Sequence, residues 1–349
     1  MSIRRSSAVM VMAGIALVAL AAIIRFWFVP SVSKLPASLD ITNTYTGTAT
    51  LLNAEAVQAG DMRNAILQDV PVTLERHTFV SSTHGDTAIV QDDLTMNAPN
   101  GVSLRSNHTY AVNRKTMLEA SAPDGTSVES HTGITVGLPV DPDPDTDYSL
   151  YDPSTRAAYP LELQGNSTVA GRDVLRYTAS AQGTLADAAT LNALPPALPK
   201  AQLTQIAALL PPDNQAKLSA ALPTLPDDVP VNYTATTNYE ISIDSTLGIP
   251  SNGSLEQQVV ANVSAGGQDI PLMPVLALDA TLDEKSVASA ADSNASTATK
   301  LDFVSIWVPL GALVIGLIAI AFGFIRRAPA SRNDNARADN KHAPVESQN

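Results

Sequence analysis

The sequence predicts a mainly β, antiparallel extracytoplasmic domain with a helical hairpin insert, flanked by two transmembrane α-helices. Three observations support this fold class. An apolar run lies near each end of the 349-residue chain. Short segments rich in β-branched residues, separated by turn residues, fill most of the region between the two runs. A Leu-, Ala- and Pro-rich stretch at residues 184–229 interrupts the β pattern.

Both apolar runs are predicted to be transmembrane helices. Residues 303–325 carry no charge and reach the roughly 20 residues that a helix needs to cross a bilayer. Residues 7–29 contain Arg25 followed by Phe26-Trp-Phe28, a cluster that suits the headgroup layer. A cleaved signal peptide is the alternative for this first run, because Ser31-Val-Ser33 forms a small-x-small cleavage site.

Arginines flank the two runs on their outer sides in the sequence. Arg4 and Arg5 precede the first run, and Arg326 and Arg327 follow the second. Lysine and arginine are enriched in cytoplasmic segments next to transmembrane helices. We therefore expect a two-span plasma-membrane protein with both termini in the cytoplasm.

The central region, residues 34–300, is then extracytoplasmic. The short N-terminus at residues 1–6 is cytoplasmic, as is a disordered tail at residues 326–349 that lacks periodic apolar residues. The central region holds 13 Lys and Arg against 30 Asp and Glu, a net charge of −17, which excludes a nucleic-acid partner. The chain has no cysteine, which excludes disulfides and indicates a bacterial envelope.

Strand patterns recur through the central region. They are rich in β-branched residues, and turn residues such as His84-Gly85-Asp86 separate them. Residues 40–180 are predicted to be β structure throughout. The predicted strands cover residues 41–50, 71–80, 87–96, 103–117, 157–177, 231–243, 255–263 and 270–282.

Two further segments share the pattern of a strand that ends in aspartate and continues through a turn into a second strand. They are residues 148–160, with Asp152, and residues 239–250, with Asp244. The pattern predicts two hairpins.

The insert is predicted to contain two short helices, at residues 200–210 and 213–222. Leu203, Ile206 and Leu210 fall at positions i, i+3 and i+7, which places them in one apolar stripe. One interpretation is a helical hairpin laid across a sheet face. The other is a lid or partner-binding element with an exposed stripe. Residues 286–299 are either a linker or a helix that leads into the second span.

An acidic loop contains the most suggestive local motif. Asp141, Asp143, Asp145 and Asp152 occupy positions 1, 3, 5 and 12, as in a calcium loop. Position 6 is Thr146 instead of glycine, position 12 is the shorter aspartate, and two prolines stiffen the segment. A solvated acidic turn is the simpler interpretation and a weak divalent-cation site is the alternative. No other cofactor is predicted.

The sequence offers no catalytic residues. It lacks a GxSxG elbow, an HExxH motif and a P-loop. The five histidines form no HxH or HxxxH pair, so we expect ordinary strand or turn residues at positions 77, 84, 108, 131 and 342. The acidic doublets, such as Asp92-Asp93, are expected to be solvated turns. Carboxylates of a hydrolase remain possible, but sequence spacing does not identify them.

The start of the central region resembles a known family. Leu35-Pro36 and the segment Tyr45-Thr-Gly47-Thr-Ala-Thr-Leu51 are similar to the porin A-like family of actinobacterial envelope membrane proteins, formerly a domain of unknown function. The segments at 148–160 and 239–250 also resemble hairpins of that family, and the similarity runs over residues 1–325. The resemblance implies two spans around one β domain, and the family name implies a channel in the outer envelope.

The residues themselves argue against an ordinary β-barrel porin. Such a barrel needs a lipid-facing apolar band with aromatic girdles, whereas aromatics make up only 5% of this chain. The layout of two terminal helices around one β domain is also similar to class B scavenger receptors. That similarity suggests lipid handling through a lumen.

The expected function is non-enzymatic: binding or transfer of an envelope lipid or glycolipid, or scaffolding of envelope assembly with other envelope proteins or with further copies of the chain. The predicted lumen is lined by Tyr239, Ile241 and Ile243 and capped by the stripe of Leu203, Ile206 and Leu210. One alternative is a pore-forming oligomer. The other is an envelope hydrolase that uses unidentified carboxylates.

Overall fold

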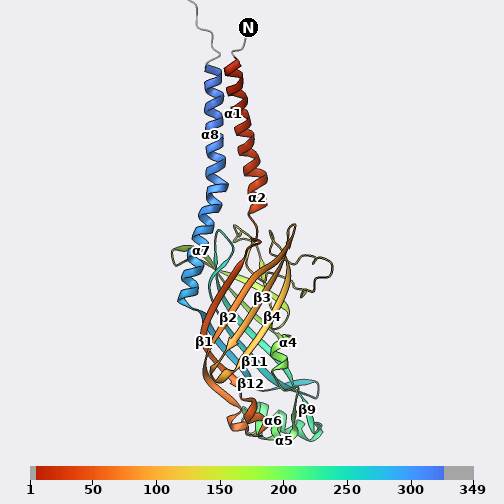
Figure 1. Cartoon of the computed structure of the whole chain (residues 1–349). Helices are drawn as coiled ribbons and strands as arrows, with labels where there is room; N and C mark the ends of the chain where they lie inside the picture. Colours follow the sequence, from red (N-terminus) through yellow and green to blue (C-terminus); the bar gives the residue numbers. More distant parts are fainter. Residues whose placement is uncertain (1–4, 326–349) are drawn as a thin grey trace, which may run out of the picture. The chain divides into compact units, whose positions relative to one another are not determined.

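The structure, a computed structural model, describes residues 5–325 (Figure 1). The chain divides into two compact units, one of Val32–Leu301 and the other of Met1–Ser31 with Asp302–Asn349. The predicted disordered tail at 326–349 and most of the N-terminus at 1–6 lie outside the described residues.

The two apolar runs are helical. Two helices of the described chain, Val9–Val32 and Glu284–Ile325, are long and apolar enough to cross a membrane by length and composition. A π-helical turn interrupts each helix at its aromatic cluster. The first helix comprises α1 (Arg5–Ile23), the turn Ile24–Phe28 and α2 (Val29–Val32), and the second contains α7 (Glu284–Asp302), the turn Phe303–Trp307 and α8 (Val308–Ile325).

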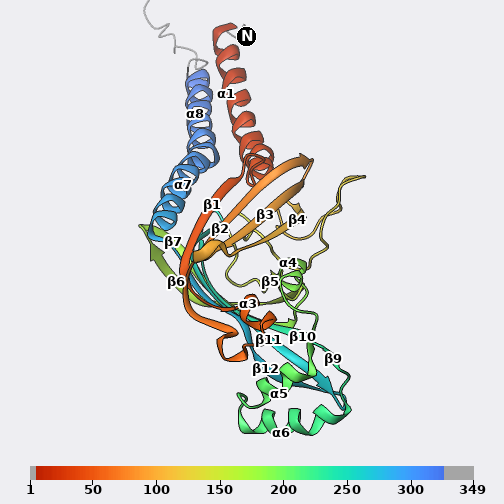
Figure 2. The same cartoon turned by 60° about the horizontal axis from the view of Figure 1, so that its bottom comes forward.

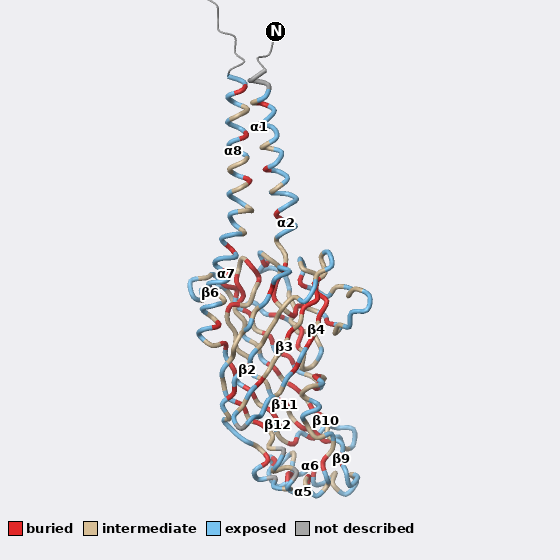
Figure 3. Tube along the Cα trace, in the orientation of Figure 1, coloured by how far each residue is buried: buried red, intermediate tan, exposed pale blue. Residues whose placement is uncertain are grey.

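Helices α1 and α8 pack against each other through glycines. A Cβ added to Gly14 would lie 2.5 Å from the carbonyl oxygen of Gly316, and a Cβ on Gly316 would lie 2.8 Å from that of Gly14. Small residues of this kind let two membrane helices approach closely. Large apolar side chains of this pair, such as those of Met12 and Leu310, remain exposed. Figure 3 shows exposed and intermediate residues along most of both helices.

Unit Val32–Leu301 is built on one curled antiparallel sheet of ten strands, which confirms the predicted fold class (Figures 1 and 2). Its order is β4-β3-β2-β1-β12-β11-β10-β7-β6-β5, so the first and last strands of the sequence pair at its centre. The strands are β1 (Asp40–Leu52), β2 (Ile66–His84), β3 (Thr87–Asn97), β4 (Ser103–Asn113), β5 (Tyr148–Asp152), β6 (Ala157–Val169), β7 (Arg172–Thr184), β10 (Asn232–Asp244), β11 (Pro250–Ala265) and β12 (Gln268–Leu282).

Turn chemistry explains several of the connections. Gly85 adopts a φ of 63° between β2 and β3, a left-handed conformation that glycine allows without steric cost. Asp152 and Asp244 end β5 and β10 as the shared pattern predicts. The side chain of Asp152 accepts a hydrogen bond from the backbone N–H of Thr155, and that of Asp244 accepts one from Thr246.

Residues 114–147 contain no strand, so the prediction of β structure throughout residues 40–180 is wrong there. This segment instead joins the two edge strands of the sheet. The backbone N–H of Glu129 donates to Thr109 on β4, and that of Ile134 donates to Ser149 on β5. Each edge strand therefore finds partners in an irregular segment, which closes the curled sheet on its open side.

The insert contains helices, as predicted. They are α4 (Ala188–Asn192), α5 (Lys200–Ala207) and α6 (Pro212–Ala221), accompanied by the short strands β8 (Ala197–Pro199) and β9 (Asp228–Pro230). Residues 286–299 belong to helix α7 and are not a linker. Four shorter elements complete the described chain. They are α3 (Ala54–Gln58) and the 3-10 turns Met62–Asn64, Pro99–Gly101 and Leu222–Thr224.

Helices α5 and α6 cover one end of the sheet (Figure 2). Leu203, Ile206 and Leu210 are buried in a core that includes Leu74 of β2 and Val259 of β11. The interpretation of this stripe as an exposed lid is therefore wrong, because the apolar face is fully used in packing against the sheet.

Candidate ligand-binding lumen

The inner side of the curled sheet contains two adjoining chambers. The first has a volume of about 180 Å³ and the second about 140 Å³. Five residues contribute to the walls of both: Tyr45, Arg76, Val136, Gly137 and Pro250. We refer to the two together as the lumen.

The first chamber lies between two apolar cores. Leu74, Met96 and Leu278 come from the core beneath α5 and α6. Tyr110 and Tyr151 come from the second core, on the other side of the chamber. The chamber wall is therefore mostly apolar, because alternate residues of each strand point inward.

The structure separates the six predicted ligand-binding residues into two groups. Tyr239, Ile241 and Ile243 of β10 line the first chamber. The stripe of α5 borders neither chamber, because its side chains are buried in the core at the end of the sheet. The predicted lumen wall is thus formed by its β residues, and its predicted helical cap is not part of it.

The acidic loop does not assemble as a calcium-like motif would require. No three acidic or histidine side chains of the described residues converge in a way that would hold a metal ion. Asp152 is fully buried, where it accepts hydrogen bonds from Thr155 and Tyr239. Asp143 caps its own turn by accepting from the backbone N–H of Asp145. The set of Asp141, Asp143, Asp145 and Asp152 is therefore divided between a solvated turn and the protein interior.

An ion pair between β2 and β3 lies in the lumen wall, with its carboxylate buried and its arginine side chain 37% exposed. Arg76 binds Asp92 through two parallel hydrogen bonds, Nε to Oδ1 at 2.8 Å and Nη2 to Oδ2 at 2.7 Å. The hydroxyl of Thr78 donates to the same carboxylate at 2.8 Å. Burial raises the pKa of Asp92, but the Arg76 guanidinium outweighs it and holds the pKa below its usual value. Asp92 is therefore a charged partner, and the expectation of a solvated turn is wrong.

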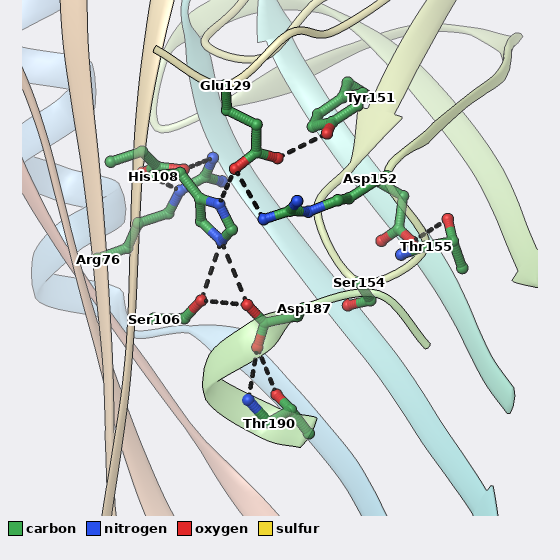
Figure 4. A network of polar contacts seen from close by, with 12 residues as sticks. Arg76, Ser106, His108, Glu129, Tyr151, Asp152, Ser154, Thr155, Asp187 and Thr190 are labelled. Atoms are coloured by element: carbon green, nitrogen blue, oxygen red, sulfur yellow. Dashed lines mark hydrogen bonds and ion pairs between the residues drawn. The ribbon is translucent and has the colours of Figure 1, made fainter. Parts of the chain in front are cut away.

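A second polar network centres on His108 of β4 (Figure 4). Its Nδ1 lies 2.9 Å from a carboxylate oxygen of Glu129, and its Nε2 lies 2.9 Å from the hydroxyl of Ser106. That hydroxyl donates to Asp187, 2.9 Å away. Tyr151 donates to the other oxygen of Glu129 at 2.6 Å. The network thus joins β4, residues 114–147, β5 and the start of α4.

The protonation of His108 determines whether this network could act in catalysis. Burial lowers the pKa of His108, but the hydrogen bond and charge of Glu129, helped by Asp187 and Asp92, raise it above its ordinary value. With a proton on each ring nitrogen, His108 donates to both Glu129 and Ser106. The Ser106 hydrogen is then directed at Asp187. The spacing resembles a nucleophile, base and orienting acid. The raised pKa favours the doubly protonated imidazole, and in that form His108 has no lone pair to accept a proton from serine.

Sequence reasoning missed the residues of both networks. Leu104, Ser106, His108 and Tyr110 alternate along β4 and share its inward face. Alternation shows that they share a face, but polar residues at such positions usually indicate the solvent side. The partners Glu129 and Asp187 are 21 and 79 residues further along the chain than His108, outside the reach of any local signal.

Two dehydratases are among the solved structures that match the chain. A MaoC-like dehydratase is 10% identical, with 77% of this chain and 82% of that chain covered, at a TM-score of 0.13. A dehydratase from a study of substrate selection for the borrelidin and fluvirucin polyketide synthases is 9% identical, with 68% and 72% covered, also at 0.13. TM-scores this low support no conclusion about fold or function. No curated protein matches the chain.

Comparison with protein families gives a match over nearly the whole chain. Residues 6–325 match the family described as Porin PorA. The matched range includes both apolar helices, the ten-stranded sheet and the insert. It also confirms the resemblance drawn from the residues after the first span. The chain therefore belongs to the Porin PorA family and is a membrane protein of the cell envelope.

Proposed function

We propose that the lumen binds an envelope lipid or glycolipid and that the protein holds or transfers this ligand at the membrane. The observation that carries the proposal is the pair of adjoining, mostly apolar chambers inside the sheet. Protein interiors are normally packed with few voids larger than a water molecule. A space of this size with apolar walls suits an acyl chain.

The dimensions of the lumen limit the ligand. The two chambers together reach only the lower end of the roughly 300–1,000 Å³ of typical small-molecule sites. A single acyl chain fits this space better than a lipid with several chains. The adjoining walls at Tyr45 and Arg76 would let one chain extend from one chamber into the other.

The second chamber favours supply of the ligand from the membrane. Its lining includes Val32, the last residue of the first apolar helix, and Ser33 and Lys34, which follow it in the sequence. It also includes Thr297 and Leu301, which directly precede the aromatic turn before α8. We propose that both termini are cytoplasmic, that the sheet lies outside the plasma membrane, and that ligand passes between the membrane and this chamber.

Hydrolysis is the second candidate, and the Ser106–His108–Glu129 spacing is the observation that favours it. The direction of the Ser106 hydrogen bond, toward Asp187, ranks it below binding. If the chain cleaves acyl esters, turnover will be lost in Ser106→Ala. If the chain only binds acyl esters, the wild type and Ser106→Ala should retain the intact ester equally well.

The test is photocrosslinking of the full-length protein in membrane nanodiscs, with a fatty-acyl probe that carries a diazirine on its chain. We expect labelled peptides from β10 and β12, and reduced labelling when Ile241→Trp fills the first chamber. Glu240→Trp is the matched control, because this neighbour on the same strand is exposed. Labelling confined to α1 and α8, unchanged by Ile241→Trp, would refute the proposal.

The same preparations distinguish the pore that the family description names. Planar-bilayer recordings of the full chain would show steady ion conductance if it forms oligomeric pores. Conductance that is abolished by Ile241→Trp, together with absence of probe labelling, would replace lipid binding with a pore through the sheet.

A further inference from the structure

We propose that the first chamber selects an amphiphile whose polar head is uncharged, such as a hydroxyl- or ester-bearing acyl lipid. This inference rests on the proposed lipid-binding function and specifies its ligand. Two independent observations support it. Every cationic side chain in the chamber wall is paired with a carboxylate, and two buried hydroxyls of the same wall have no hydrogen-bond partner.

The charges of the first chamber are already compensated within the protein. Among its described lining residues the cationic side chains are Arg76 and His108. Arg76 is bound to Asp92 through two hydrogen bonds, and His108 lies between Glu129 and Asp187. A bidentate guanidinium–carboxylate pair leaves little attraction for a further anion.

An anionic head would therefore enter an unfavourable field. It would approach the carboxylates of Asp92 and Asp187, which also line this chamber, and would gain no free cation. Bringing another negative charge out of water without a partner is unfavourable. A phosphate or carboxylate head is thus selected against, whereas a neutral head avoids this cost.

Two neutral hydroxyls complete the site. The hydroxyls of Tyr110 and Thr135 are buried and have no hydrogen-bond partner, and both residues belong to the wall of the first chamber. Tyr110 is 1% exposed and Thr135 is 8% exposed. Buried polar groups are nearly always paired, and exceptions often mark a functional site. The two oxygen atoms are covered by neighbouring wall atoms, so a ligand hydroxyl or ester oxygen would reach them, with neutral hydrogen bonds, only when those atoms move aside.

A third buried hydroxyl provides an internal control. Tyr177 also has no hydrogen-bond partner, but it borders neither chamber. Tyr110→Phe, Thr135→Val and Tyr177→Phe each remove one hydroxyl at nearly constant volume. Only the first two alter the chamber, so only they should affect the ligand.

The experiment measures displacement of a fluorescent acyl probe from the full-length protein in nanodiscs. The competitors share one palmitoyl chain and differ in the head: monopalmitoylglycerol, palmitate and palmitoyl lysophosphatidic acid. We expect the glycerol ester to bind at least 10-fold more tightly than either anion. Tyr110→Phe and Thr135→Val should weaken it by about 3- to 10-fold, the range of one neutral hydrogen bond, and leave the anions unchanged.

The possible results distinguish a failure of the uncharged-head specificity from a failure of lipid binding. Equal or tighter binding of the anions, or equal effects of Tyr177→Phe and Tyr110→Phe, would overturn the uncharged-head specificity while lipid binding stands. Failure of all three competitors to displace the probe, with no effect of Ile241→Trp on the probe itself, would overturn lipid binding. A melting temperature of ligand-free Tyr110→Phe at or above that of the wild type would confirm that its hydroxyl makes no bond within the protein.

Discussion

The helical end of the sheet and the lumen are both built from apolar side chains, but they are packed differently. The core beneath α5 leaves a cavity of about 20 Å³ beside Ile206, too little for a ligand. The first chamber, a short distance along the same strands, leaves about 180 Å³. Helices supply a second apolar surface at the end of the sheet, whereas the facing walls of the lumen are joined by polar networks. An apolar stripe therefore predicts burial, but whether it borders a cavity depends on what faces it.

The ion pair of the lumen wall should have the largest effect on stability. Asp92→Asn keeps the shape of the side chain but leaves Arg76 without its carboxylate. We expect a loss of about 3 kcal/mol in the free energy of unfolding, the low end for breaking a buried ion pair, because the Arg76 side chain is 37% exposed. Urea denaturation of the full chain measures it. The double variant Arg76→Met, Asp92→Leu removes both charges and should recover most of that stability. A cost below about 0.5 kcal/mol for the single variant would show that water already screens Arg76.

Truncation in the packed end should come next. Leu203→Ala removes a side chain that is 0% exposed and should cost about 2–3 kcal/mol, within the range for leucine-to-alanine changes in cores. Because Leu203 borders neither chamber, affinity for the acyl probe should stay unchanged in the fraction that remains folded. A specific loss of probe binding would place the helical stripe in the ligand site after all.

The corresponding truncation in the lumen should destabilise the protein less and should change its preference among acyl probes. Ile241 borders the first chamber, so its side chain already contacts empty space. Ile241→Ala should cost about 1–2 kcal/mol, below the cost of Leu203→Ala, since fewer packing contacts are lost. The enlarged chamber should shift the preferred chain length of the acyl probe upward. A cost equal to that of Leu203→Ala would indicate that this wall is as tightly packed as the helical end.

The His108 network should give the smallest effect, and one that depends on pH. The pKa of His108 is raised in the folded protein, so its contribution is fully present below the ordinary histidine pKa of about 6.5. That contribution is lost as the pH rises through the raised pKa. His108→Gln should lower the free energy of unfolding by about 1 kcal/mol at pH 6 and by less at pH 9.

Denaturant titrations at several pH values between 6 and 9 measure this difference. His84→Gln is the control, because His84 is the exposed last residue of β2 and its loss should leave the pH profile of the wild type intact. A constant effect of His108→Gln across this range would mean that the Glu129–His108 contact does not depend on a proton.

Local sequence signals were sufficient for the elements of this fold. Alternation and glycine turns predicted the β2–β3 hairpin, and a terminal aspartate predicted the hairpins that begin at β5 and β10. These signals succeed because secondary structure depends on the preferences of neighbouring residues. They failed at residues 114–147, where the irregular backbone takes many of its hydrogen bonds from distant parts of the sheet, such as Thr109, Ser149 and Gly248.

The family resemblance and the apolar helices were also available from the sequence, because both depend on short segments and their order. The lumen was not. Arg76 meets Asp92 through the register of β2 with β3, and His108 meets Glu129 and Asp187 only after the sheet curls and residues 114–147 cross its open side. The sequence determined which residues face inward or outward along each strand. The tertiary structure alone decided which inward residues pack together and which enclose space, because that depends on curvature and closure across the whole sheet.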